Sequence, residues 1–267
     1  MSIHFFNKYT YTKLPISYSF NLNIMIATSL YTYIAILIRN KLPIEKWFFP
    51  AFLIGILLPD IDTIIIFLNF LNINLYNHTF GHSIISALLI YLILLITYEI
   101  YKEKAYLNLA NGIVSGMLLH IFLDILMSIN LINIFWPLPF NAITIYNNVI
   151  IQYYLKTYIN ILFFLLFRYF FFYSIECIIN NSNKKGYLIK ILSLSMTIEI
   201  YIIILYAIFM VLDMKEISNL IFLIGYCFSI LISYYTILSG WNSFNYLKNE
   251  KNKKGLFKKE RELININ

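Results

Sequence analysis

Residues 51–70 read AFLIGILLPDIDTIIIFLNF, an apolar run that is interrupted by one polar group, Pro59-Asp60-Ile61-Asp62. The run is hydrophobic enough to enter a bilayer, where an ionisable side chain costs roughly 3 kcal/mol or more and usually marks a functional site. Proline cannot continue the hydrogen-bond ladder of a helix. We therefore expect the turn around Gly55 to loosen, so that the two carboxylates can converge.

Two more polar groups lie inside or at the edge of apolar runs. They are Asn77-His78-Thr79-Phe80-Gly81-His82-Ser83 and His120-Ile121-Phe122-Leu123-Asp124. The chain has four His and four Asp, and three of each lie in the three polar groups. His120 and Asp124 are four residues apart, hence on one face of a helix, where both can coordinate one ion. His82 begins the next apolar run, at a depth that matches the Pro59 group.

The composition excludes a soluble globular protein. Hydrophobic residues make up 60% of the 267 residues and charged residues 12%, and the mean hydropathy is +0.74. So little polar surface predicts an all-α, multi-pass transmembrane helical bundle. About seven spans are expected, at residues 22–38, 47–70, 83–101, 107–129, 158–179, 187–212 and 217–244. The segment 130–156 contains Trp136-Pro137-Leu138-Pro139, so we expect it to fold back on the membrane surface and to cap the polar groups.

Charge predicts the orientation of the bundle. The net charge is +7, and residues 248–261 carry seven Lys or Arg. Cytoplasmic segments next to a membrane carry the excess of basic residues, and the loops 39–46, 102–104 and 184–190 are basic as well. The C-terminus is therefore predicted inside and the N-terminus outside. The alternative for these basic residues is a dedicated lipid- or nucleic-acid-binding patch. Membrane lipid is the expected partner of the protein, and no nucleic acid is expected.

The chain divides into four regions on the same grounds. An N-terminal arm (1–20) precedes a membrane-embedded region with the polar groups (21–146). The C-terminal transmembrane helices (147–247) and a basic cytoplasmic tail (248–267) follow.

Carboxylates and imidazoles together suit Zn(II), Mn(II) or Fe(II), and zinc is the first choice. The candidate ligands of this divalent metal are Asp60, Asp62, His82, His120 and Asp124. The alternative is a buried polar network that joins the second, third and fourth spans by hydrogen bonds between helices.

At these residues the chain resembles the YdjM-like family of inner-membrane metal-dependent hydrolases, also described as LexA-binding. The family motifs PDxD, HRGxTHS, HxxxD and a later WP correspond to the three polar groups and to Trp136-Pro137, and the resemblance covers about residues 20–140. It implies a hydrolase in the plasma or inner membrane, if the source is bacterial, that acts on a lipid or phosphoester through a metal-activated water. His82 would be catalytic as well as a ligand, and His78 a ligand or proton donor.

Two departures from the family pattern bear on activity. Asn77 stands where the family has the first His of its second motif, unless a one-residue slip makes His78 that ligand, and residues 20–25 lack a His that the family has. A degenerate membrane scaffold and an ion-coupled transporter are the alternative functions. A transporter would show broken helices in two related halves.

Two charged residues lie outside the motifs, Arg168 in the fifth predicted span and Glu199 in the sixth. Counted from the short turn between these spans, they lie at matching depths at about 1.5 Å per residue. We expect them to form an ion pair, because neither charge is stable alone in the bilayer. The alternative is that Glu199 joins the metal site.

Overall fold

The computed structural model describes residues 27–61, 81–127, 134–135, 137–138, 149–180 and 186–245. Every regular element in these ranges is a helix, which confirms the all-α class. The α-helices are α1 (Ala27–Ile38), α2 (Phe48–Leu57), α4 (Ile84–Tyr101), α5 (Lys104–Met127), α6 (Val149–Ile179), α7 (Gly186–Val211) and α8 (Lys215–Ser239). Two short 3-10 helices, η2 (Arg39–Lys41) and η3 (Pro59–Ile61), follow α1 and α2.

Five of these helices are long and apolar enough to cross a membrane: α4, α5, α6, α7 and α8. The first two predicted spans are shorter where they are described, with 12 residues in α1 and 10 in α2, and they continue into residues 22–26 and 62–70, which lie outside the described ranges. A total of seven spans, the inside and outside assignment and the basic tail therefore stay predictions.

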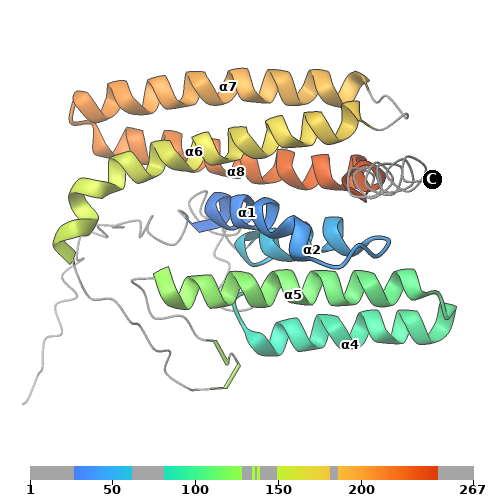
Figure 1. Cartoon of the computed structure of the whole chain (residues 1–267). Helices are drawn as coiled ribbons and strands as arrows, with labels where there is room; N and C mark the ends of the chain where they lie inside the picture. Colours follow the sequence, from blue (N-terminus) through green and yellow to red (C-terminus); the bar gives the residue numbers. More distant parts are fainter. Residues whose placement is uncertain are drawn as a thin grey trace, which may run out of the picture.

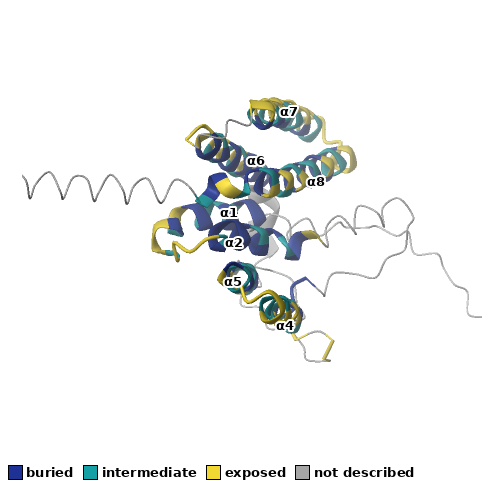
Figure 2. Cartoon of the chain, turned by 90° about the vertical axis from the view of Figure 1, so that its right-hand side faces the viewer, coloured by how far each residue is buried: buried dark blue, intermediate teal, exposed yellow. Residues whose placement is uncertain are grey.

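The helices stack in layers, as the end view in Figure 2 shows. The hairpin of α4 and α5 lies on one side, the short helices α1 and α2 form the middle, and α6 and α8 separate them from α7 (Figure 1). All residues of α2 except Ile54 are buried. In the span of α4, by contrast, only 11% of the residues are buried inside the protein, so this helix presents most of its side chains to lipid.

Three glycines bring α2 and α5 into direct backbone contact. A Cβ atom added at Gly55 would lie 2.0 Å from the carbonyl oxygen of Ile113, and one added at Gly116 would lie 2.3 Å from that of Phe52. Gly112 meets the Phe48 carbonyl in the same way. Small residues four apart allow helices to approach closely in membranes, where the hydrophobic effect does not drive their association. The glycines therefore set the position of α2 against α5.

The C-terminal helices pack through aromatic rings instead. Phe163, Phe164 and Phe167 of α6 are buried against Phe222 and Tyr226 of α8, with ring centroids 4.7 to 5.7 Å apart in five of these pairs. Helix α6 begins at Val149, so the prediction that residues 149–156 belong to an irregular segment is wrong. They contain neither proline nor glycine, and nothing in them stops a helix.

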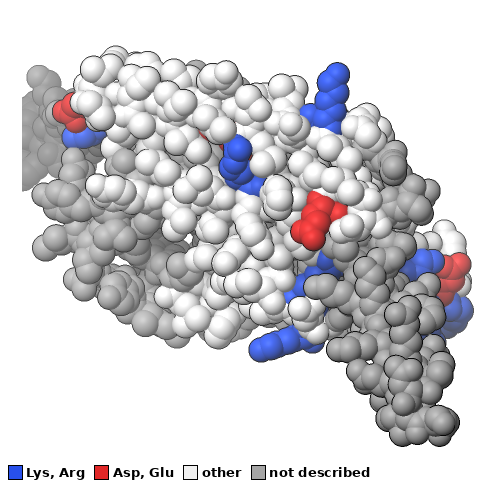
Figure 3. All heavy atoms as spheres, turned by 45° about the horizontal axis from the view of Figure 1, so that its top comes forward, with Lys and Arg blue, Asp and Glu red and all other residues white. Residues whose placement is uncertain are grey.

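The basic loops lie at one end of the bundle, and the turn from α7 to α8, which carries Asp213, Lys215 and Glu216, lies at the other. The end of α1, the turn from α4 to α5, the facing ends of α6 and α7, and the last described residues all lie at the basic end (Figure 1). Charged side chains on the described surface in Figure 3 are few and lie singly or in small groups, and most of the face is uncharged. The grouping of the basic loops on one side agrees with the predicted topology.

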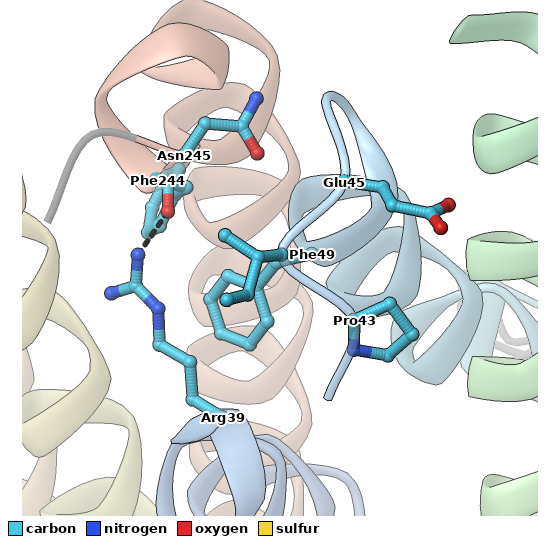
Figure 4. Close-up of a pocket in the computed structure, with 7 residues that line it drawn as sticks. Arg39, Pro43, Glu45, Phe49, Phe244 and Asn245 are labelled. Atoms are coloured by element: carbon cyan, nitrogen blue, oxygen red, sulfur yellow. Dashed lines mark hydrogen bonds between the residues drawn. The ribbon is translucent and has the colours of Figure 1, made fainter. Parts of the chain in front are cut away.

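Arg39, predicted as a loop residue that marks topology, is instead buried at this end. Its guanidinium donates to the Tyr173 hydroxyl of α6 and to the Phe244 carbonyl that follows α8 (Figure 4). It also lies 4.6 Å from the ring centroid of Phe49, beside a small pocket that Pro43, Ile44, Glu45 and Asn245 help to line. One cation therefore holds the middle layer against the C-terminal helices.

Candidate metal centre

The described residues of the polar groups meet at the end of the bundle opposite the basic loops (Figure 1). Helix α2 ends at Leu57, before the proline, and the chain turns into η3, which carries Asp60. His120 and Asp124 lie on the last two turns of α5, and His82 lies in the turn that precedes α4. The side chain of Ser83 caps α4 by accepting from the Ile85 amide at 3.1 Å, so the backbone next to His82 is fixed. The predicted break at Pro59 is confirmed.

Four ionisable side chains converge there. One ligand atom each from Asp60, His82 and His120 lies within 4.8 Å of the other two, and all three residues are buried. Asp124 Oδ2 adds an oxygen 3.1 Å from His120 Nε2 and 3.4 Å from His82 Nε2. Asp60 lies 3.9 Å from each imidazole, through Oδ1 to His82 Nε2 and through Oδ2 to His120 Nε2. For comparison, two ligand atoms of one tetrahedral zinc ion lie about 3.3 Å apart.

The hydrogen bond of His120 determines which of its nitrogens can bind a cation. Its Nδ1 lies 2.7 Å from the carbonyl oxygen of Ile56, which can only accept, so Nδ1 carries the proton. In the neutral ring Nε2 then holds a lone pair, and it faces Asp124 Oδ2. Neither of these two buried atoms has a hydrogen bond to any described residue. Metal-binding histidines show the same arrangement, with the second nitrogen bound to a backbone carbonyl.

Two hydroxyl groups of helix α1 donate hydrogen bonds to carboxylates of the site. Tyr31 donates to Asp124 Oδ1 at 2.6 Å, and its ring meets the His120 ring edge-on at 4.8 Å. Thr28 donates to Asp60 Oδ2. Both side chains are fully buried. Sequence analysis missed them because Thr and Tyr are uncharged and the chain has 23 tyrosines, so neither residue stands out.

Of the predicted ligands, Asp60, His82 and His120 form one buried group that could hold a metal ion, and Asp124 lies beside both imidazoles. The other residues predicted at the site lie outside the described ranges; they are Asp62, Asn77, His78 and Trp136. Of the segment predicted to cap the site, the buried Ile134 is described, and its carbonyl accepts a hydrogen bond from the Ile84 amide at 2.9 Å. Ile84 lies two residues after His82, so the chain that follows α5 is tied to the beginning of α4.

The expected ion pair between Arg168 and Glu199 is not formed within 4 Å in the described structure. Arg168 Nη1 donates to the Met196 carbonyl at 2.7 Å, one turn before Glu199 on α7. Glu199 Oε1 accepts from Ser229 of α8 at 2.7 Å. Arg168 and Glu199 do lie at matching depths to within one turn, but their side chains point to different partners around the helices. Glu199 binds Ser229 and is not in the metal-ligand group.

A family model described as YdjM inner membrane protein matches residues 24–217. This match covers most of the chain, so the protein belongs to that family. Together with the five apolar helices, it shows an integral, multi-pass membrane protein. No curated protein and no solved structure matches the chain.

Proposed function

We propose that this member of the YdjM inner membrane protein family is a membrane-bound, metal-dependent hydrolase. The observation that carries the proposal is the approach of His120 Nε2 to Asp124 Oδ2, 3.1 Å apart, while His120 Nδ1 is held by the Ile56 carbonyl. Two acceptors at this distance repel each other unless a cation or a proton lies between them. A network that only joined helices would satisfy its buried polar atoms by hydrogen bonds.

The donor set fits a divalent ion. Two imidazoles and two carboxylates without a thiolate are typical of catalytic rather than structural zinc, and Mn(II) or Fe(II) would accept the same ligands. The proposed ligands are Asp60, His82, His120 and Asp124, with Asp62 as a further one. Tyr31 holds Oδ1 of Asp124, which leaves Oδ2 turned toward the two histidines.

A bound divalent ion would lower the pKa of a water ligand and polarise a phosphoryl or acyl oxygen. His82 or His78 would carry the proton to the leaving group. His82 lies in the turn before α4, two residues from the Ile84 amide that donates to the Ile134 carbonyl. Because the site lies among apolar helices, a lipid or lipid-linked phosphoester is the proposed substrate.

The helices of the C-terminal half argue against an ion-coupled transporter. Such transporters place paired broken helices around their ion site. The break at Pro59 has no counterpart in α6, α7 or α8, each of which is continuous over its described length.

The proposal is tested with the purified protein in detergent micelles. Wild type should hold bound zinc, and Asp124→Asn should lower zinc affinity by more than about 100-fold, because even outer partners of metal ligands contribute about 10–100-fold. Asp213→Asn is the matched control, since Asp213 is exposed and pairs only with Lys215 among the described groups. Turnover of phosphodiester and phosphomonoester lipid analogues should disappear with a chelator and return with zinc.

Two results would overturn the proposal in different ways. A wild-type protein without metal would mean that a proton lies between His120 and Asp124, and that the cluster is a polar network. Bound metal without turnover of any ester analogue would identify a degenerate, non-catalytic member of the family.

A further inference from the structure

We propose that α8 completes the metal centre, with the Tyr226 hydroxyl positioning the Asp60 carboxylate through Thr28. This inference rests on the proposed function, because Asp60 is one of the proposed ligands. Tyr226 lies outside the residues matched by the family model, which ends at residue 217, near the beginning of α8.

The chain of contacts is short and fully buried. The Thr28 hydroxyl donates to Asp60 Oδ2 and lies 2.7 Å from the Tyr226 hydroxyl. Thr28 and Tyr226 both have 0% exposure, and Asp60 has 1%. Without competing water, each of these hydrogen bonds is stronger than it would be at a surface.

The chemistry of the groups determines the direction of the two bonds. A carboxylate can only accept, so the single proton of the Thr28 hydroxyl is used toward Asp60. Thr28 then accepts from the phenol, and the bonds run from Tyr226 to Thr28 to Asp60. Bonds that follow one another in this way polarise and strengthen each other.

The ring of Tyr226 packs against aromatic residues of the C-terminal helices. Its ring centroid lies 4.8 Å from that of Phe163 on α6 and 6.3 Å from that of Phe222 on α8. The position of its hydroxyl is therefore fixed by the aromatic packing of α6 and α8. This packing reaches the metal centre through Thr28, although α8 supplies no proposed ligand.

The hydrogen bond from Thr28 restricts the rotation of the Asp60 carboxylate. With Oδ2 of Asp60 anchored by Thr28, the carboxylate plane is set, and with it the place of Oδ1, 3.9 Å from His82 Nε2. Outer partners of metal ligands act in this way, by orienting the ligand atom before the ion binds. Tyr226 and Thr28 are thus positioning residues, and neither is a ligand.

The test compares two buried tyrosines, of which Tyr226 contacts Thr28 and Tyr206 contacts Asn160. Tyr226→Phe removes the hydroxyl that reaches Thr28, and Tyr206→Phe removes an equally buried hydroxyl that accepts from Asn160 at 2.9 Å, between α6 and α7. Zinc affinity is measured by competition with a chromophoric chelator, and the cobalt-substituted protein is followed by its visible absorption. Tyr226→Phe should weaken zinc by about tenfold and change the cobalt spectrum, whereas Tyr206→Phe should do neither.

Thr28 variants keep the inference testable if Tyr226→Phe folds poorly. Thr28→Val should weaken zinc by about tenfold as well, and Thr28→Ser, which keeps the hydroxyl, should restore affinity to within about twofold of wild type. In the double variant of Thr28→Val with Tyr226→Phe, the loss should equal that of Thr28→Val alone, because Tyr226 acts through Thr28.

A purely structural hydrogen bond would lower thermal stability equally in the two tyrosine variants and leave zinc affinity unchanged, which would overturn the inference. Independent, additive losses in the double variant would overturn it too. Neither result affects the proposed function as long as wild type binds zinc. Wild type without zinc would overturn both.

Discussion

The two halves of the bundle differ in the residues through which their helices pack. Helices α2 and α5 meet backbone to backbone through glycines, and they carry three of the four converging ionisable side chains on or directly after them. Helices α6 and α8 meet through edge-on and tilted aromatic rings, and a buried acid on α7 is bound by a serine of α8. Glycine contact leaves no side chain between the two backbones that could move to change their distance. Ring packing adapts more easily, so the half that holds the metal ligands is the one that needs glycine.

The largest effect is expected from Gly55→Ala. Its methyl group would lie 2.0 Å from the Ile113 carbonyl, so α2 and α5 must separate. We expect a loss of about 3 kcal/mol in the free energy of unfolding or more, because overpacked cores cost about 1–3 kcal/mol even where side chains can move. Bound zinc should be lost as well, since Asp60 moves away from His120.

The matched control is Gly186→Ala, at the start of α7. A Cβ atom added there meets nothing within 4 Å. Unfolding by denaturant in detergent should show a change within about 1 kcal/mol, which is the helix-propensity difference. Equal losses in the two variants would mean that α2 and α5 are not in contact as described.

A smaller effect, limited to stability, is expected from Phe167→Ala. The Phe167 side chain is fully buried, and its ring lies 4.7 Å from that of Phe163 and 6.3 Å from that of Phe171. Loss of a buried phenylalanine costs about 3 kcal/mol or more in soluble cores, and lipid that fills the gap will reduce this value. Zinc content at saturation should stay that of wild type, in contrast to Gly55→Ala. Loss of zinc from this variant would show that both halves set the ligand positions equally.

The smallest effect is expected from Glu199→Gln. The amide oxygen of glutamine can still accept from Ser229, so the cost should be about 1 kcal/mol, the difference between a hydrogen bond to a charged group and one to a neutral group. Zinc affinity should not change. If zinc were lost while the melting temperature stayed the same, Glu199 would belong to the metal centre after all.

The site could be predicted from the sequence to the extent that it consists of rare residues. Four residues stand out because ionisable groups are costly in apolar spans: Asp60, His82, His120 and Asp124. Pro59 predicted the break in the helix just before Asp60. Thr28, Tyr31 and Tyr226 could not be found in this way. Threonine and tyrosine are tolerated in membrane helices, and only the folded chain shows which of them meet a carboxylate.

The packing was predictable only in part. Gly112 and Gly116 are four residues apart, a spacing typical of close helix contacts in membranes, but the sequence does not say which helix they meet. Arg168 and Glu199 were placed on the right helices and at nearly the right depth. Rise along the axis gives depth, whereas the facing side chain depends on rotation about the axis, at about 3.6 residues per turn. Arg168 therefore reaches the Met196 carbonyl, one turn away from Glu199.

The enclosed position of α2 has a consequence for biosynthesis. This helix has 10 residues, is buried on nearly all sides, and is covered by α5, which the ribosome completes about 70 residues after the end of α2. Until α5 has been made, the glycine face of α2 has no partner, and until residue 226 has been made, Thr28 lacks its donor. Contacts so distant in sequence form late, after their loop entropy has been overcome. The centre is therefore assembled only after most of the chain has been inserted, and a nascent chain that stops before α8 would reach the membrane without a finished site.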